Sequence, residues 1–560
     1  MLKILPKDRL AIFFFYDAQG IADPYVIDLI KGLNTIAGRL LVVVNGELTP
    51  QSAEEIAPLA DEIFCRPNVG FDAWAYKDAF EHIGWDELRK YKEVVYCNAT
   101  VYGPVFPFSE MFDRMAEKED LDFWGITFHP DLMTKDTLNP LGYIPEHIQH
   151  YFVVYRQKFT AAPELKDYWD HLPPIRNYAE TVGLHETVFT KHFADMGFKW
   201  DTYIRYDQAV ESTNYILMFE PLKAITKYRS PVIKRKIFFL DPRFTLINSM
   251  GERIPALLDY LRDNKLYDTG IIYRNIIRTS NQADFIDALN FRCIVPENAR
   301  LTKKPEADYG ARTALITLQD SSEESRARAE EAAAHMPRGA EIIPLTNVPD
   351  NTEEFFQQLK KAAREREFVC VCNCAVVAER RHSTSGKSLA TSQIRALLAT
   401  RKTVCNIIDS FDAQPFYGLL VPMYPLTLEF GAHWHDRWQG TYQEVRALTE
   451  ALDISVPFCE EKYPAVPYFS CFWMRSAALL PLLSDESALS RLVGEPISVL
   501  RRIYPLAVQR FGYSPGYVTT DQLAGHQFSA LFYYAENLSR INVSLDSLVK
   551  KIAAEQGIEI

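Results

Sequence analysis

Short apolar runs alternate with helical segments along the first third of this chain. Each run is rich in β-branched and aromatic residues and is bounded by polar residues or glycine, which is typical of a buried strand. The predicted strands are residues 10–16, 39–45, 62–65 and 94–97, and the predicted helices cover 25–33, 52–60 and a segment that begins over 74–80. Strands separated by helices pair in parallel through right-handed crossovers. The pattern therefore predicts an α/β, Rossmann-like fold with a mostly parallel sheet.

Length and composition narrow the class of protein. The 560 residues exceed what a single hydrophobic core supports, so two or three domains are expected. Hydrophobic residues make up 48% of the chain and aromatic residues 13%, which is enough for packed cores. The net charge of -12 argues against a general nucleic-acid binder, which needs a basic face. A local basic pocket for a diphosphate is compatible with this charge.

The nine cysteines give no metal or disulfide signature. Cys370, Cys372 and Cys374 alternate along one predicted strand, a spacing that fits neither paired zinc knuckles nor a redox Cys-x-x-Cys motif. We interpret them as buried reduced thiols of a cytoplasmic protein.

No apolar run reaches the roughly 20 residues that a membrane-spanning helix needs. The run Leu10–Tyr16 is short and is bounded by Asp8 and Asp17, so it is neither a signal peptide nor a span. The basic stretch 223–236 leaves two interpretations open, a solvated face and a surface that docks on a membrane. We expect a cytoplasmic protein, with peripheral association at the inner face of the membrane as the alternative.

The second half of the chain repeats the order of the first. A new strand at 314–318 opens it. Four further segments of the first half then recur in the same order: 68–72 as 342–350, 94–99 as 368–374, 123–130 as 416–422 and 150–156 as 468–475. Several echoes in one order indicate a duplicated fold. We predict two α/β domains, residues 1–225 and 306–560, joined by a helical linker module at 226–305.

The strand at 94–97 ends in small polar residues, and a glycine-proline turn follows it. The sequence continues as Asn98-Ala-Thr100 and then as Gly103-Pro104. Ligands bind at the carboxyl ends of strands in an α/β sheet, because the loops there open a crevice. Glycine at positions 70 and 103 permits close approach of the backbone to a ligand. This layout is typical of a nucleotide-sugar site.

Several motifs carry a resemblance to a known family. They are residues 68–77 (Asn-Val-Gly-Phe-Asp-Ala-Trp-Ala-Tyr-Lys), 98–104, 122–127, 147–152 and 186–190 in the first half, and 418–425, 472–475, 495–496 and 504–509 in the second. With these motifs the chain resembles the rhamnan synthesis protein F family of glycosyltransferases, which make rhamnose-rich cell-wall and O-antigen polysaccharides. The resemblance implies a GT-A-like fold, a nucleotide diphosphate sugar as donor (dTDP-rhamnose first) and a growing polysaccharide or lipid-linked glycan as acceptor, with no organic cofactor.

Two departures from the family pattern bear on the chemistry. The family continues after Asn98 with an acidic residue, where a GT-A enzyme keeps its metal-binding Asp-x-Asp motif, whereas this chain has Ala99. A divalent cation, Mg or Mn, loses an expected oxygen ligand there, and a cationic side chain or a helix N-terminus would then offset the charge of the leaving diphosphate. In the repeat, Leu500-Arg-Arg-Ile503 stands where the first half has Glu186, so we interpret the second domain as degenerate.

Seven residues near the strand ends are predicted to bind the donor. Contacts to the ribose or base are expected from the aspartates, a contact to the diphosphate from the lysine, and hydrogen bonds to sugar or phosphate from the amide and hydroxyl groups. The predicted donor residues are Asp17, Asn68, Gly70, Asp72, Lys77, Asn98 and Thr100. Each has a structural alternative: a turn or helix-cap aspartate, a solvated surface lysine, or a polar cap at a strand end.

An inverting transfer needs a carboxylate that accepts the proton of the acceptor hydroxyl. The resemblance implies this mechanism, and Glu186, at the start of a predicted helix that runs to about Met196, is the candidate base. The alternative is a first-turn glutamate placed for the helix dipole, and Glu180 is a weaker competitor. The predicted acceptor residues are Trp124, His147, Gln149 and His150. Core packing and structural hydrogen bonding are the alternatives for these four.

The sequence thus predicts a glycosyltransferase whose N-terminal domain transfers a deoxyhexose such as rhamnose to a polysaccharide hydroxyl. The C-terminal domain would bind the acceptor glycan, order the enzyme or mediate assembly. The rival interpretation is a non-catalytic glycan-binding or scaffold protein built from two decayed transferase domains. Ala99 and the missing carboxylate of the repeat favour this rival.

Overall fold

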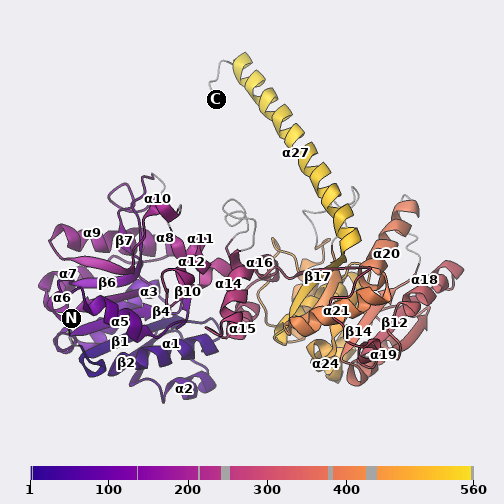
Figure 1. Ribbon diagram of the computed structural model, residues 1–560, viewed down its shortest axis with the longest axis horizontal. Coiled ribbons are helices and arrows are strands. Elements are labelled where there is room, and N and C mark those ends of the chain that lie inside the picture. Colours follow the sequence, from indigo (N-terminus) through magenta and orange to yellow (C-terminus); the bar gives the residue numbers. More distant parts are fainter. Residues whose placement is uncertain are drawn as a thin grey trace. The chain divides into compact units, whose positions relative to one another are not determined.

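The computed structural model describes the chain apart from residues 1, 3, 135–136, 212, 214, 241–252, 376–382, 424–437 and 557–560, and apart from the side chains of 209–210, 383–389 and 541–556. The end of the predicted motif 418–425 therefore lies outside the described residues. The chain divides into two compact units, Met1–Asn275 and Ile276–Ile560 (Figure 1). Each unit is a mostly parallel sheet with helices around it, which confirms the predicted fold class.

The sheet of the first unit is parallel in its first half and changes direction at β8. Its strands run in the order β3 (Glu62–Arg66), β2 (Arg39–Asn45), β1 (Arg9–Tyr16), β4 (Glu93–Asn98), β8 (Phe152–Arg156), β6 (Phe123–His129) and β7 (His147–Ile148), with β9 (Trp200–Ile204) paired to β6. The central strand β1 pairs in parallel with β2 and β4, as the strand-helix alternation predicts. The carboxyl ends of these three strands therefore meet at one edge of the sheet.

The helices of the first unit pack around this sheet. They are α1 (Pro24–Asn34), α2 (Pro50–Ile56), α3 (Phe71–Ile83), α4 (Trp85–Leu88), α5 (Phe108–Ala116), α6 (Gln157–Ala161), α7 (Pro163–Asp170), α8 (Tyr178–Thr181), α9 (Thr187–Asp195), α10 (Gln208–Glu211), α11 (Ile216–Phe219), α12 (Pro221–Thr226) and α14 (Arg253–Asp263). A π-helical turn, η2 (Val182–Glu186), joins α8 to α9. Aromatic side chains dominate the core beneath α3, among them Phe80, Tyr96, Tyr155 and Trp169, all almost fully buried.

The second unit has the same strand order as the first. Its sheet runs β13 (Glu341–Thr346), β12 (Thr313–Gln319), β14 (Phe368–Asn373), β16 (Phe472–Arg475), β15 (Tyr417–Pro422), β17 (Ser514–Thr520) and β11 (Arg292–Val295). The first six correspond in order to β2, β1, β4, β8, β6 and β9. In both units the fourth of these strands is antiparallel to its neighbours, and the sixth is parallel to the fifth. The topology supports the predicted duplication.

Helices also precede, connect and follow the strands of the second unit. They are α16 (Gln282–Ala288), α17 (Glu306–Gly310), α18 (Glu323–Ala334), α19 (Glu353–Glu365), α20 (Ser383–Leu398), α21 (Arg401–Ala413), α23 (Tyr442–Ala451), α24 (Ser476–Ser484), α25 (Glu486–Leu492), α26 (Ile497–Arg510) and α27 (Asp521–Gln556). α26 precedes β17 as α9 precedes β9, so the two helices occupy the same place in the repeat.

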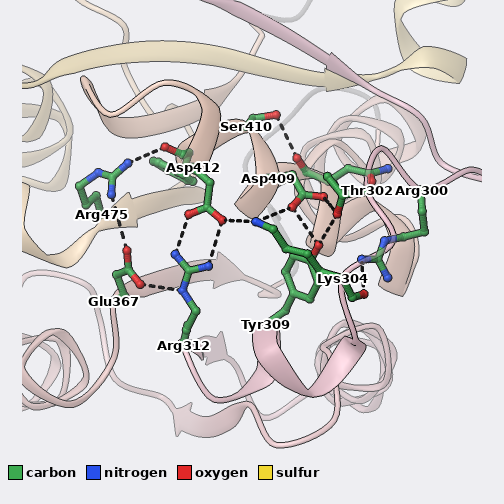
Figure 2. A network of polar contacts seen from close by, with 12 residues as sticks. Arg300, Thr302, Lys304, Tyr309, Arg312, Glu367, Asp409, Ser410, Asp412 and Arg475 are labelled. Carbon is green, nitrogen blue, oxygen red and sulfur yellow. Dashed lines mark hydrogen bonds and ion pairs between the residues drawn. The ribbon is translucent and has the colours of Figure 1, made fainter. Parts of the chain in front are cut away.

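An arginine-glutamate-arginine triad recurs at the amino end of β4 and β14. In the first unit Glu93 accepts a hydrogen bond from Arg9 Nε (2.6 Å), and Arg156 Nε lies 3.6 Å from its other carboxylate oxygen. In the second unit Glu367 lies between Arg312 (2.6 Å) and Arg475 (3.8 Å), within the network of Figure 2. The first triad is buried, whereas the side chain of Glu367 is 45% exposed.

The predicted helical linker module at 226–305 is divided between the two units. Its first part forms β10 (Ile233–Lys234), which pairs antiparallel with β5 (Val101–Tyr102) of the first unit. The helix α15 (Thr269–Thr279) carries the boundary between the units, and β11 joins the second sheet. The segment around Lys234 is therefore an integral part of the first unit.

The basic stretch 223–236 has partners within the first unit. Lys223 and Lys227 both pair with the buried Glu211, and Lys234 lies against Thr100. Across the part of the chain that the structure describes, no helix combines the length and the apolar character that crossing a bilayer requires.

Candidate active site

Asn98 and Asp72 meet at the carboxyl end of β4, where the sequence predicts the donor site. Asn98 is the last residue of β4, and its Nδ2 donates to Asp72 Oδ2 (2.9 Å). Its Oδ1 accepts from the backbone N of Thr100 (3.2 Å) and from Thr100 Oγ1 (2.6 Å). One amide side chain thus fixes a carboxylate on one side and a hydroxyl on the other.

Gly70 places Asp72 by turning the chain from β3 into α3. Its φ of 75° lies in the left-handed region, and a Cβ at this position would lie 2.4 Å from Trp74 Cβ. Only glycine fits both conditions. Asn68 belongs to a hydrogen-bonded group just before this turn, because its Oδ1 accepts from Asn45 Nδ2 (3.2 Å).

Glu186 lies inside a helix rather than at its start. The helix α8, the π-helical turn that ends at Glu186, and α9 follow one another without a break. The predicted start of the helix at this residue is therefore wrong, and so is the alternative of a first-turn glutamate. Extra-residue turns of this kind occur often at functional sites. Glu186 Oε1 accepts a long hydrogen bond from the backbone N of His150 (3.4 Å).

Lys234 completes the cluster from a distant part of the sequence. Pairing of β10 with β5 sets Lys234 opposite Val101, next to the end of β4. Lys234 Nζ donates to Thr100 Oγ1 (3.0 Å) and lies 4.5 Å from the ring centroid of Tyr151. The sequence gives only a weak signal for Lys234, the basic run 234–236. This run falls within the predicted linker module.

The charges of this cluster act on one another in a partly buried setting. Burial and the Glu186 carboxylate raise the pKa of Asp72 to about 6, while Lys234 opposes the rise. Burial also raises the pKa of Glu186, against the effects of Lys234, the His150 N–H, His129 and Lys236. Burial lowers the pKa of Lys234 to about 8, although Glu186 and Asp72 act to raise it. Groups with pKa values displaced toward neutrality are typical of active sites.

The raised pKa of Asp72 predicts a stability gain for Asp72→Asn. A raised pKa means that the folded state binds the proton more tightly, so burial of the ionised carboxylate costs stability as pH rises from about 4 to about 6, and the full cost persists above that range. The amide removes this cost and still accepts a hydrogen bond from Asn98. We expect about 1–2 kcal/mol of added stability at pH 7.5 and none near pH 4. Chemical denaturation at both pH values checks this, and an equal gain at both would contradict it.

Of the predicted acceptor residues, His150 contacts Glu186 through its backbone N–H, and Gln149 precedes it in the chain. Gln149 Oε1 accepts from Thr127 Oγ1 (2.7 Å). A hydrogen bond joins His150 Nδ1 to His185 Nε2 (3.0 Å), and burial lowers the pKa of both imidazoles far enough to keep them neutral. His150 Nε2 has no partner among the described residues. That atom is itself buried, so it does not lie on an open surface of the site.

Four predicted site residues make their contacts elsewhere. His147 Nδ1 donates to the carbonyl of Pro145 (2.7 Å). Asp17 Oδ1 accepts from two backbone N–H groups of the turn after β1. Lys77 Nζ donates to the carbonyl of Asp170 (3.0 Å). Trp124 is fully buried, and its ring packs against Phe112. None of these contacts joins the four side chains to Asn98, Asp72, Glu186 or Lys234.

The residues at the end of β4 do not fit a divalent metal ion. Among the described residues, no group of three or more His, Cys, Asp or Glu side chains could hold one. At the end of β4 the oxygen donors are the Asn98 amide, the Thr100 hydroxyl and a single carboxylate, that of Asp72. The Lys234 ammonium donates to the Thr100 hydroxyl. Hard cations prefer several carboxylate oxygens, and an ammonium group at the same place repels them.

The matching place in the second unit holds an internal ion pair. Arg501 of α26 stands at the position of Glu186, and its Nε donates to Ser470 Oγ (2.8 Å). Ser470 also hydrogen-bonds Asp350, whose carboxylate lies 3.9 Å from Arg501. An arginine here neutralises the carboxylate instead of supplying a base, which agrees with the interpretation of a degenerate domain.

The first unit thus combines an α/β fold with a half-buried charged cluster at the carboxyl end of β4. The profile of the family described as rhamnan synthesis protein F matches the chain twice, over residues 40–318 and 311–504. The chain therefore belongs to the rhamnan synthesis protein F family. No curated protein matches the sequence significantly.

Solved structures share only low similarity with the chain. A nucleotide-diphospho-sugar transferase from Desulfovibrio desulfuricans G20 is 13% identical over 40% of this chain and 91% of its own, with a TM-score of 0.23. A cytidylyltransferase from Leptospira borgpetersenii is 14% identical over 48% and 97%, with a TM-score of 0.21. Core-mannan synthase A from Aspergillus fumigatus, in a Mn/GDP form, is 11% identical over 30% and 64%, with a TM-score of 0.19. At such scores these likenesses support no argument about function.

Proposed function

We propose that the first unit transfers a sugar from a nucleoside diphosphate donor to a hydroxyl of a growing glycan, with inversion at the sugar carbon. The observation that carries the proposal is the cluster at the carboxyl end of β4. There the half-buried Glu186 carboxylate, the Asp72–Asn98 pair and the Lys234 ammonium influence one another's charge. Membership in the rhamnan synthesis protein F family supports glycosyltransferase chemistry.

Glu186 is the proposed base. The acceptor oxygen forms a bond to the sugar carbon while its proton passes to the Glu186 carboxylate. The bond from that carbon to the phosphate oxygen breaks, and its electron pair leaves with the nucleoside diphosphate. The raised pKa of Glu186 improves it as a base at neutral pH.

The remaining side chains orient the two substrates. Asn98 and Thr100 would hydrogen-bond donor sugar or phosphate, and Asp72 would contact a ribose or sugar hydroxyl. Gln149 and His150 would hold the acceptor, as predicted from the sequence. Roles for Asp17, Lys77, His147 and Trp124 stay predictions from the sequence.

The proposed donor is an activated deoxyhexose, dTDP-rhamnose, and the proposed acceptor is a cell-surface polysaccharide or its lipid-linked precursor. The family name supports a rhamnose-containing product. The second unit would bind acceptor glycan or order the enzyme, because its own cluster is neutralised by Arg501. A scaffold without catalysis is the second candidate, and Ala99 at the place of an expected acid favours it.

A donor assay tests the proposal and separates these candidates. The full chain is incubated with dTDP-, UDP- and GDP-linked sugars and an oligosaccharide of rhamnose, and release of nucleoside diphosphate is followed. We expect turnover with one nucleotide class and a product of inverted configuration. Binding of the glycan without turnover of any donor would favour the scaffold.

A further inference from the structure

We propose that Lys234 neutralises the leaving diphosphate of the donor, in the place that a divalent metal ion takes in a metal-dependent transferase. This inference rests on the proposed function. It adds the identity of the cation at the site, and it predicts transfer without added metal.

The backbone holds Lys234 firmly beside the end of β4. The short β10–β5 ladder pairs Lys234 with Val101, and the backbone N of Arg235 donates to the carbonyl of Thr100 (3.0 Å). Arg235 Nη1 also donates to the carbonyl of Ala99 (2.8 Å), and its guanidinium lies 4.7 Å from the ring centroid of Tyr25. These contacts of Arg235 fix the backbone next to Lys234, and the hydrogen bond to Thr100 orients the Lys234 ammonium group.

The ammonium group keeps unused hydrogen-bonding capacity. Lys234 Nζ can donate three hydrogen bonds, and one of them goes to the neutral hydroxyl of Thr100. No carboxylate of the described residues lies within the 4.0 Å that defines an ion pair with this group, although Asp72 and Glu186 lie near enough to affect its pKa. A cation that is half-buried and not matched by a direct counter-ion favours an anionic ligand.

The surrounding charges suit a diphosphate rather than a metal ion. Lys236 and Arg235 add positive charge beside Lys234, and both act to lower its pKa. Lys236 Nζ lies 5.1 Å from the ring centroid of Tyr178, and its charge acts to lower the pKa of Glu186. When the sugar-phosphate bond breaks, negative charge grows on the departing oxygen. A fixed cation nearby stabilises that charge more than it stabilises the intact donor.

The residue types at 98–100 agree with this assignment. An acidic residue at position 99 would supply a metal ligand, but it would also place a third carboxylate near Lys234. Alanine removes the metal ligand and leaves the ammonium free to face phosphate. The absence of an acid at position 99 and the hydrogen bond from Lys234 to Thr100 therefore both favour an ammonium group over a metal ion at this place.

The test measures binding of a nucleoside diphosphate to the full chain in the presence of EDTA. Isothermal titration with dTDP, UDP and GDP identifies the nucleotide that binds the wild-type protein. Lys234→Met, which keeps the length of the side chain and removes the charge, should weaken binding of that diphosphate about 10- to 100-fold. Binding of the corresponding monophosphate should change less than about threefold, because the terminal phosphate carries the contact.

Two further variants separate a role for charge from loss of folding. Lys234→Arg keeps a positive charge and should recover much of the diphosphate affinity. Lys227→Met removes a lysine of the same basic stretch, which pairs with Glu211 instead, and should bind like the wild-type protein. Recovery in the arginine variant together with loss in the methionine variant supports the inference.

Three outcomes would overturn it. Lys234→Met could bind the diphosphate as tightly as the wild-type protein, or the wild-type protein could bind or transfer only after Mg²⁺ or Mn²⁺ is added. Either result removes the role of Lys234 and leaves the proposed transferase function standing. A wild-type protein that binds no nucleoside diphosphate, with or without metal, removes both.

Discussion

Replacing Glu186 by glutamine is expected to lower kcat for sugar transfer by about 10²- to 10⁴-fold, the range that a general base contributes. The amide has nearly the shape of the carboxylate and can still accept the hydrogen bond from His150 N. It cannot take the proton of the acceptor hydroxyl. Because Glu186 is proposed to act on the acceptor, the Kd of the nucleoside diphosphate should stay within about threefold of wild type.

The matched control is Glu180→Gln, one helical element earlier. Glu180 accepts hydrogen bonds from Arg176 N (2.7 Å) and Asn177 Nδ2 (3.0 Å) at the exposed start of α8. Its replacement should leave kcat unchanged. Normal turnover by Glu186→Gln, or an equal loss in both variants, would show that the base has been assigned wrongly.

The pH profile of the wild-type enzyme gives a second view of the same residue. Transfer should fall at acid pH as Glu186 becomes protonated, at a pH above the ordinary range of a glutamate because burial raises its pKa. It should fall again above about pH 8 as Lys234 loses its proton. The titratable groups that act on Glu186 are Lys234, Lys236 and His129. The Glu186 carboxylate in turn raises the pKa of Asp72. In Glu186→Gln the acid limb should be lost from the residual activity.

Glu93→Ala is expected to destabilise the first unit by about 3–5 kcal/mol. Glu93 lies between Arg9 and Arg156, and all three side chains are at most 7% exposed. Removal of the carboxylate leaves two buried guanidinium groups without their counter-charge. The cost of such an uncompensated charge exceeds the small net contribution of the intact triad.

The second unit supplies the matched control for this prediction. Glu367 also lies between two arginines, Arg312 and Arg475, but its side chain is 45% exposed. Arg312 keeps Asp412 as a second partner (Figure 2). Glu367→Ala should therefore cost less than about 1 kcal/mol. Urea unfolding of the full chain measures both stability losses when proteolysis is used to monitor the unfolding of each unit separately. Equal losses in the two variants would contradict the role that we assign to burial.

The fold could be predicted from the sequence because its signal is local. Apolar runs such as Leu10–Phe15 and Leu40–Val44 are buried strands, and the helices between them force parallel pairing. The repeat was also visible in the sequence, since segments such as 94–99 and 368–374 recur in one order. In the structure Asn98 and Asn373 each end the equivalent strand and accept from the N–H two residues later (3.2 and 3.1 Å). The antiparallel insertion of β8 and β16 depends on long-range pairing and was not predicted.

Within the candidate site, local sequence rules reach the residues at strand ends, and the family resemblance adds Glu186. Asn98, Thr100 and Asp72 follow from the rule that loops at carboxyl ends of strands bind ligands. Lys234 was missed because it reaches the cluster through a ladder with residues 101–102, more than a hundred positions earlier. Trp124 was assigned a sugar contact on residue type alone, and its burial in the core depends on packing with α5 that no local pattern reveals.

The measurement that tests the central claim most directly is the donor assay run on two matched tryptophan variants. Thr100→Trp places a bulky ring at the end of β4, and Ala375→Trp does the same at the corresponding end of β14. If the cluster of the first unit alone carries the chemistry, Thr100→Trp abolishes release of nucleoside diphosphate and Ala375→Trp retains it. Full activity of Thr100→Trp, or loss confined to Ala375→Trp, would contradict the assignment of the active site.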